Sequence, residues 1–236
     1  MSLIKACIVV PALNEGKQIG IFLERLEESV ATPVEVLVVV DTPDDSTLMG
    51  INRYSPKKHQ IRGVVSEFSK GPANAIRYGI SVSNADIVVI TMADGSDDPR
   101  VIDDLIRLIE RGCDVAAASR YMAGGQQIGG PRLKKFLSKN ASRALWFFLG
   151  VGTHDSTNSF KAYSKKFISE VGIESDKGFE VGIELIAKAH RNRRMIAEVP
   201  TIWIDRMIGE SNFQIRRWLP QYLRWFFYAF GPKSSK

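Results

Sequence analysis

Three carboxylates, Asp94, Asp97 and Asp98, occur within five residues, directly after a run of β-branched residues at 87–91. Such a run is typical of a strand buried on both faces of a parallel sheet. In open α/β sheets, ligands bind beyond the carboxyl ends of the strands. Clustered carboxylates repel one another unless a cation binds, and a divalent metal carrying a nucleotide diphosphate is the usual one. We therefore favour ligand binding for Asp94, whereas Asp98, just before Pro99, is better explained as a helix cap.

Polar residues also follow the other apolar runs of the first half of the chain. The first run ends in Pro11, and Asn14 and Glu15 come just after it. Glu15 could accept hydrogen bonds from a base or ribose hydroxyl, while Asn14 could either do the same or cap the next helix. Asp41 ends the second run, and Lys70 opens a helix whose backbone N–H groups could meet phosphate. Together these side chains predict a site, although each one alone is weak evidence.

Strand and helix patterns alternate along the first half of the chain. We expect strands over 6–10, 35–40, 61–65, 86–91, 114–119 and 157–163, with two short strands within 195–205. Helices are expected over 17–30, 46–54, 71–83, 99–111, 132–149 and 179–191, followed by an amphipathic segment at 213–230. The glycine-rich stretch 121–131 is typical of a mobile loop. The pattern predicts one α/β domain with a mostly parallel sheet and helices on both faces, divided into a nucleotide-binding half (1–120) and an acceptor half (121–236).

The bulk properties fit a globular domain with an anionic partner. The 236 residues are enough for one full core, and the net charge of +6 suits nucleic acid, a lipid surface or a phosphorylated substrate. Nucleic acid ranks last because the basic residues are dispersed and no nucleic-acid motif occurs. Cys7 and Cys113 are expected to be reduced core residues, as in cytosolic proteins. We expect neither a signal peptide nor a membrane-spanning helix, because no apolar run is long enough.

Several motifs in order resemble the family 2 glycosyltransferases of the GT-A (Rossmann-like) fold. They include Val-Pro-Ala-Leu-Asn-Glu (10–15), Val-Val-Asp (39–41), Ser-Arg-Tyr (119–121) and Asp-Ser-Thr-Asn-Ser-Phe-Lys-Ala-Tyr (155–163), together with Gly-Glu-Ser (209–211). The resemblance extends from Val10 to Phe213 and is strongest to the dolichol-phosphate mannosyltransferase-like, or polyprenyl-phosphate, subgroup. It implies inverting transfer of a hexose, mannose or glucose, from GDP-mannose or UDP-glucose to a polyprenyl or dolichyl phosphate. The acceptor phosphate is already anionic, so the protein's tasks are to position it and to stabilise the leaving diphosphate.

The resemblance also implies roles for residues at the nucleotide end. The residues expected to bind the nucleotide sugar are Pro11, Asn14, Glu15, Asp41, Lys70, Ala93 and Asp94. Asp94, assisted by Ser96, is expected to hold Mg²⁺ or Mn²⁺. The family pattern is Asp-x-Asp, but Met92 occupies the first position here, and a thioether is a poor ligand for these hard cations. Ser96, Asp97 or a water could compensate for the missing carboxylate.

For the acceptor phosphate, the resemblance implies Arg120, Lys134, Ser138 and Arg206 as binding residues. Asp155 is expected near the acceptor and the sugar, and Asp94, Asp155 and Arg206 are the expected catalytic residues. The aromatic and basic segments 134–149 and 216–228 are typical of helices at a membrane interface, although packing on the domain or on a second subunit would explain them too. We expect a protein at the cytosolic membrane face and leave its oligomeric state open. The alternatives are transfer to a soluble or glycan acceptor, and a catalytically weakened nucleotide-sugar-binding protein.

Overall fold

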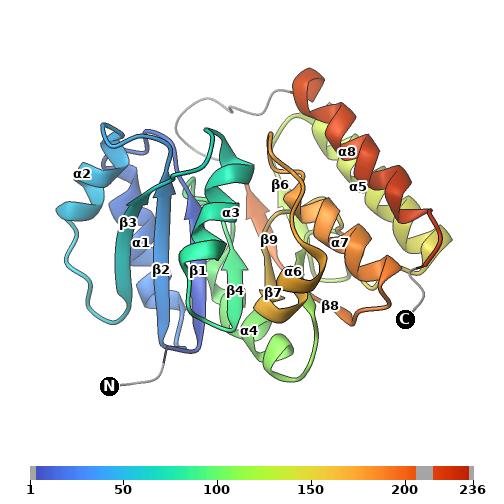
Figure 1. Ribbon diagram of the computed structural model, residues 1–236, viewed down its shortest axis with the longest axis horizontal. Helices are drawn as coiled ribbons and strands as arrows, with labels where there is room; N and C mark the ends of the chain where they lie inside the picture. The colour runs from blue at the N-terminus through green and yellow to red at the C-terminus, as the bar shows by residue number, and fades with distance from the viewer. Residues whose placement is uncertain (1–3, 206–214, 234–236) are drawn as a thin grey trace.

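A seven-stranded sheet runs through the centre of the molecule, and helices cover both of its faces (Figure 1). The computed structural model describes residues 4–205 and 215–233. In spatial order the strands are β3 (Gln60–Val65), β2 (Val34–Val40), β1 (Ala6–Pro11), β4 (Ile87–Ile90), β7 (Lys161–Ser164), β5 (Val115–Ser119) and β8 (Ile196–Pro200). All pairings are parallel except those of β7, which runs antiparallel to β4 and β5. A second, two-stranded parallel sheet joins β6 (Gln126–Ile128) to β9 (Ile202–Ile204).

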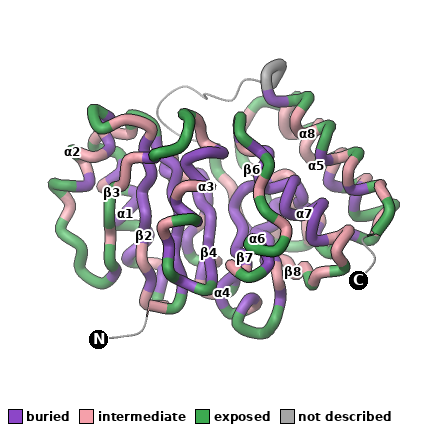
Figure 2. The backbone as a smooth tube through the Cα atoms, viewed as in Figure 1, coloured by how far each residue is buried: buried purple, intermediate pink, exposed green. Residues whose placement is uncertain are grey.

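The helices form two layers because alternate residues of each strand face opposite sides of the sheet. Ile8 and Val10 of β1 pack in one core with α1 (Gln18–Ser29), α2 (Ser46–Asn52) and α4 (Ile102–Glu110), which the 3₁₀ turn η1 (Pro99–Val101) precedes. Cys7 and Val9 face the other core, which includes residues of α3 (Pro72–Val82), α5 (Arg132–Leu149), α6 (Lys165–Val171), α7 (Val181–Arg191) and α8 (Ile215–Ala229). Most of the central strands are therefore buried on both faces (Figure 2).

The order of the strands creates an opening at one edge of the sheet. From β1 the chain proceeds outward through β2 and β3, then returns to place β4 on the other side of β1. Such a reversal leaves a crevice at the carboxyl ends of the two strands that flank it. Pro11 ends β1, Asp41 directly follows β2, and Met92 comes soon after β4, so three predicted site segments meet at this edge.

The mostly parallel α/β fold with helices on both faces is confirmed. Cys7 and Cys113 are buried free thiols, also as predicted. The prediction of a loop over 121–131 was wrong in part, because Gln126–Ile128 pairs with β9, a partner too distant in the sequence to show as a local pattern. The strand expected over 157–163 is confined to Lys161–Ser164, and α6 after it was not expected.

Candidate active site

A cleft of about 690 Å³ opens at the carboxyl ends of β1, β2 and β4. It continues between α5, α7 and α8, so residues from both halves of the sequence line it. Eight of the residues predicted for the site lie along this cleft: Pro11, Glu15, Asp41, Ala93, Asp94, Arg120, Lys134 and Ser138. The tertiary structure therefore brings most of the predicted nucleotide and acceptor residues into one continuous space.

The other predicted residues that the structure describes do not line this cleft. Asn14 is exposed, and its backbone N–H donates to both carboxylate oxygens of Asp45. It does not cap α1 either, because that helix begins after Lys17 with no side-chain cap. Lys70 lines a separate, smaller depression, and the N–H of Gly71 donates to the Asp41 carboxylate at 3.0 Å. Arg206 lies outside the described residues.

The acidic turn after β4 is held by its own hydrogen bonds. The Ser96 N–H donates to Asp94 Oδ1 at 3.0 Å, and Gly95 between them has a φ of +70°. Asp98 is the cap of η1, as predicted, and accepts the Arg100 N–H at 3.1 Å. Ser96 is buried, and its hydroxyl has no hydrogen-bond partner in the described part of the chain.

Asp97 is one of the three groups that the sequence offered as a replacement for the missing carboxylate, and the structure shows how it is held. It is 6% exposed, lines the cleft, and accepts hydrogen bonds from the Thr91 hydroxyl at 3.0 Å and the Met92 N–H at 3.3 Å. Burial, together with the negative charge of nearby Asp94, raises the pKa of Asp97 to about 7. A bound cation would reverse this repulsion between the two carboxyl groups.

The donor atoms in this part of the cleft suit Mg²⁺ or Mn²⁺. Asp94 and Asp97 offer hard carboxylate oxygens, which these ions prefer over nitrogen or sulfur. Within residues 4–205 and 215–233, no group of three or more His, Cys, Asp or Glu side chains is placed to hold a metal. Mg²⁺ is usually bound by one or two carboxylates, and phosphate oxygens of the substrate complete its coordination.

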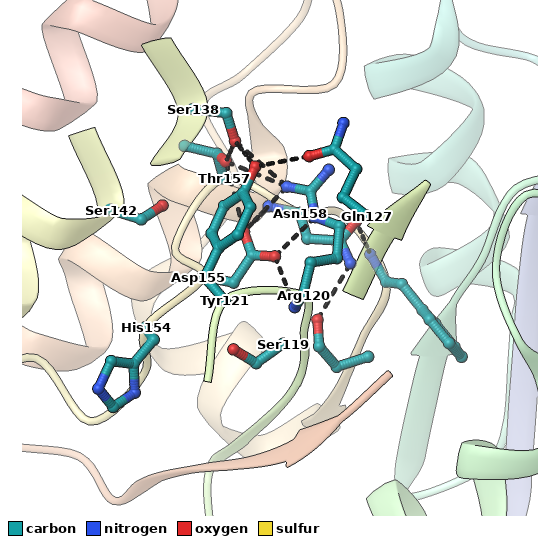
Figure 3. Close-up of polar contacts among 12 residues, drawn as sticks. Ser119, Arg120, Tyr121, Gln127, Ser138, Ser142, His154, Asp155, Thr157 and Asn158 are labelled. Atoms are coloured by element: carbon teal, nitrogen blue, oxygen red, sulfur yellow. Dashed lines mark hydrogen bonds and ion pairs between the residues drawn. The ribbon is translucent and has the colours of Figure 1, made fainter. Parts of the chain in front are cut away.

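Arg120, which lines the cleft, forms a buried ion pair with Asp155 (Figure 3). Arg120 Nε donates to Asp155 Oδ2 at 2.7 Å, Nη2 donates to Oδ1 at 2.9 Å, and the Arg120 backbone N–H adds a third bond at 3.0 Å. Burial alone would raise the pKa of Asp155, but the Arg120 guanidinium holds it below its usual range. Asp155 is fully buried and does not line the cleft, so its carboxylate is held against Arg120 and is not presented to the cleft.

Hydroxyl groups extend this network toward the cleft. Arg120 Nη2 donates to Ser138 Oγ at 3.2 Å, and Ser138 Oγ lies 2.5 Å from Thr157 Oγ1. The Tyr121 hydroxyl lies 3.0 Å from Ser138 Oγ, and the Tyr121 ring lies under the guanidinium, 4.9 Å from its carbon. Thr157 and Tyr121 were not among the predicted site residues, although both lie within the motifs that contain Asp155 and Arg120.

Lys161 is a further charged residue that the sequence analysis did not single out. It is fully buried on β7, and its ammonium donates to the backbone carbonyl oxygens of Ser156 and Asn158. Burial lowers the pKa of Lys161 to about 7, although the charges of Asp155 and Asp97 oppose this effect. The burial of Lys161 was not predicted, because lysine residues in strands are usually exposed.

The far part of the cleft is an apolar groove between two helices. Leu137, Ala141 and Ala144 line it from α5, at the spacing of one helix face. On α8 the lining residues include Leu219, Leu223 and Phe226, also at helical spacing, and α7 contributes Ile183. The cleft is thus polar at the strand ends and apolar between the helices.

Comparisons with known proteins identify the family and the fold of the chain. The family model described as glycosyl transferase family 2 matches residues 7–172. The chain is 27% identical over 214 residues to polyprenol monophosphomannose synthase of Mycolicibacterium smegmatis, covering 88% of this chain and 80% of that protein. It is 26% identical over 231 residues to dolichol-phosphate mannosyltransferase of Pyrococcus furiosus, covering 94% of this chain but only 64% of that protein.

Solved structures share the fold. Glucosyl-3-phosphoglycerate synthase of Mycobacterium tuberculosis, in complex with Mn²⁺, UDP and glucosyl-3-phosphoglycerate, is 18% identical with a TM-score of 0.70, covering 98% of this chain and 81% of that one. The same synthase with Mg²⁺ and UDP has a TM-score of 0.67 at 19% identity, with the same coverage. At these identities the likeness establishes the architecture.

Proposed function

The chain belongs to glycosyl transferase family 2, and we propose that it is an inverting glycosyltransferase that moves a hexose from a nucleotide-diphosphate sugar to a polyprenyl or dolichyl phosphate. The names of the two relatives support mannose as the sugar; the proposed donor is GDP-mannose, and UDP-glucose is the rival. The proposed location is the cytosolic face of a membrane.

The observation that carries this proposal is the change in chemistry along one cleft. At the strand ends, Glu15, Asp41 and Asp94 provide oxygen acceptors for a nucleoside and a metal-bound diphosphate. At the other end, the groove between α5 and α8 offers apolar side chains, as a polyprenyl tail requires. Arg120, Lys134 and Ser138 line the same cleft. They would bind the phosphate group of a lipid whose polyprenyl tail lies in the apolar groove.

The proposed chemistry depends on positioning more than on proton transfer. A lipid phosphate is anionic at neutral pH, so it attacks the anomeric carbon of the sugar without a strong general base. Arg120 and Lys134 orient that phosphate, and the Asp155 carboxylate fixes the plane of the Arg120 guanidinium. A divalent ion, when bound, would neutralise charge on the leaving diphosphate.

The surface next to the groove supports contact with a membrane. Exposed apolar residues gather on the two helices that form the groove: Leu133, Phe136, Trp146, Phe147 and Phe148 on α5, and Leu219, Leu223 and Phe227 on α8. Arg132 and Lys139 are exposed on α5 as well. Aromatic and basic residues together are typical of helices that lie in a membrane interface. Across the described residues, no helix has the length and apolar character needed to cross a bilayer.

A groove-filling variant tests the acceptor assignment. Ala144→Phe places a large ring in the groove and should abolish transfer to polyprenyl phosphate while leaving nucleoside diphosphate binding unchanged. Arg143→Phe, one residue away on the exposed surface, is the matched control and should keep lipid transfer in detergent. If Ala144→Phe transfers to polyprenyl phosphate at the wild-type rate, or if only a soluble acceptor such as 3-phosphoglycerate is used, the lipid acceptor is wrong.

Vesicle flotation tests the proposed membrane contact separately. The wild type should float with vesicles that contain anionic lipid, and Phe147→Ser with Phe148→Ser should reduce the bound fraction. These two side chains are 70% and 69% exposed, so the change should not disturb the fold. Equal flotation of the wild type and the double variant would argue against this surface.

A further inference from the structure

Met92 occupies the position where the family pattern has the first metal-binding aspartate. Its side chain is partly buried and packs against the apolar core that contains α3 and α7. A thioether is a soft, weak ligand, and Mg²⁺ and Mn²⁺ bind to hard oxygens. Residue 92 therefore supplies no ligand, and one carboxylate is missing from the motif.

The structure places another carboxylate at the backbone of residue 92. After Asp94 the chain turns back at Gly95, where φ is +70°, and Asp97 Oδ2 accepts the backbone N–H of Met92 at 3.3 Å. The Thr91 hydroxyl donates to the same oxygen at 3.0 Å, which fixes the side chain. Asp97 Oδ1 accepts no hydrogen bond from the described part of the chain, and the residue lines the cleft together with Asp94.

We infer that Asp97 supplies the second carboxylate for the divalent metal, in place of the aspartate that residue 92 lacks. Its Oδ1 would be the ligand atom, while its Oδ2 keeps the hydrogen bonds from Thr91 and Met92. Such a hydrogen-bonded carboxylate is oriented before the metal arrives, which favours binding. The inference rests on the proposed function, because a nucleoside diphosphate completes the coordination of the metal.

The neighbouring residues of the turn are less suitable for this role. Ser96 is 3% exposed and does not line the cleft, and a neutral hydroxyl contributes no charge. Both oxygens of Asp98 are engaged by Arg100, at distances from 2.6 to 3.1 Å, and the residue caps η1. Asp97 is the carboxylate of the turn besides Asp94 that lines the cleft.

The test measures Mn²⁺ binding directly, without turnover. Free Mn²⁺ is followed by electron paramagnetic resonance while the full-length protein is titrated in the presence of GDP, and separately of UDP. Asp97→Asn keeps the shape and the hydrogen bonds at Oδ2 but removes the charge. It should weaken Mn²⁺ binding by at least the roughly 10- to 100-fold that loss of an outer partner of a metal ligand costs. Asp98→Asn is the matched control and should bind Mn²⁺ as the wild type does, since asparagine also caps helices.

A carboxylate exchange completes the test. Adding Met92→Asp to Asp97→Asn returns a second carboxylate to the same part of the cleft and should recover most of the lost affinity. If Asp97→Asn binds Mn²⁺ within twofold of the wild type, while Asp94→Asn does not, Asp97 is not a ligand and the proposed function stands. If the wild type binds GDP or UDP but Mn²⁺ has no effect, the inference also fails. Absence of any nucleotide binding would overturn both the inference and the proposed function.

Discussion

Replacing Asp155 by asparagine removes the charge that balances Arg120 while keeping nearly the same volume. Asp155 is fully buried, and Arg120 is 8% exposed. Three hydrogen bonds from Arg120 and one from the Asn158 N–H converge on this carboxylate. In the variant, the side-chain NH₂ group, which is a donor, replaces one carboxylate oxygen and faces an N–H donor of Arg120. The guanidinium also loses its counter-charge.

The expected loss of stability follows from burial. Removing one partner of a buried ion pair costs about 3–5 kcal/mol, because the other charge remains buried and uncompensated. With a urea slope of about 3 kcal/mol/M, the unfolding midpoint should fall by roughly 1 to 2 M. Asp104→Asn is the matched control, because Asp104 and Arg107 also form a pair at 2.7 Å, but with side chains 53% and 57% exposed. An exposed pair of this kind contributes less than about 1 kcal/mol.

The pH dependence gives a second signature of the same pair. The pKa of Asp155 lies below its ordinary value of 3.8, so the carboxylate stabilises the native state above pH 3.8, and this contribution is lost as the pH falls through the lower folded-state pKa. The difference between wild type and Asp155→Asn should therefore narrow in acid. Because we propose that Arg120 orients the acceptor phosphate, the variant should also lose lipid-phosphate use but keep nucleotide binding. A urea midpoint lowered no more than in Asp104→Asn would refute the reasoning.

Three other outcomes are expected. Asp94→Ala should abolish metal-dependent nucleotide binding, measured by calorimetry, and sugar transfer, measured with a radiolabelled donor. Unchanged turnover would show that Asp94 is not an active-site residue. By the family resemblance, Arg206→Ala should raise the KM for polyprenyl phosphate without changing the Kd for nucleotide, and equal losses of both would misplace this residue. The pKa of Asp97 is raised from 3.8 to about 7, so the folded protein holds an extra proton between these values, and metal-free stability should decline as pH rises through this window. In denaturant titrations at several pH values, the free energy of unfolding of Asp97→Asn should not show this decline. If the free energy of unfolding falls equally with pH in the wild type and the variant, the raised pKa of Asp97 is not its cause.

The periodicity of apolar residues predicted most of the helices and strands, because the burial of each element on one or both faces is visible in its local sequence. The β-branched runs before Pro11, Asp41 and Met92 became β1, β2 and β4, and polar residues after each run mark the ligand edge of the sheet. The failures were non-local. The pairing of β6 with β9 joins segments more than seventy residues apart, and the short β7 is held antiparallel by neighbours on both sides.

For the site, the sequence by itself determined which chemistry is available: carboxylates at strand ends, cations in the acceptor half, and aromatic helices after them. Only the tertiary structure decided how these groups are used, because burial and hydrogen bonding depend on partners that are distant in the chain. In the folded chain Asp155 is buried behind Arg120, and Lys70 lines a separate depression outside the cleft. Helices α5 and α8 together form the apolar groove. The tertiary structure also folded Asp97 back onto the backbone of Met92, a proximity that their five-residue separation along the chain does not reveal.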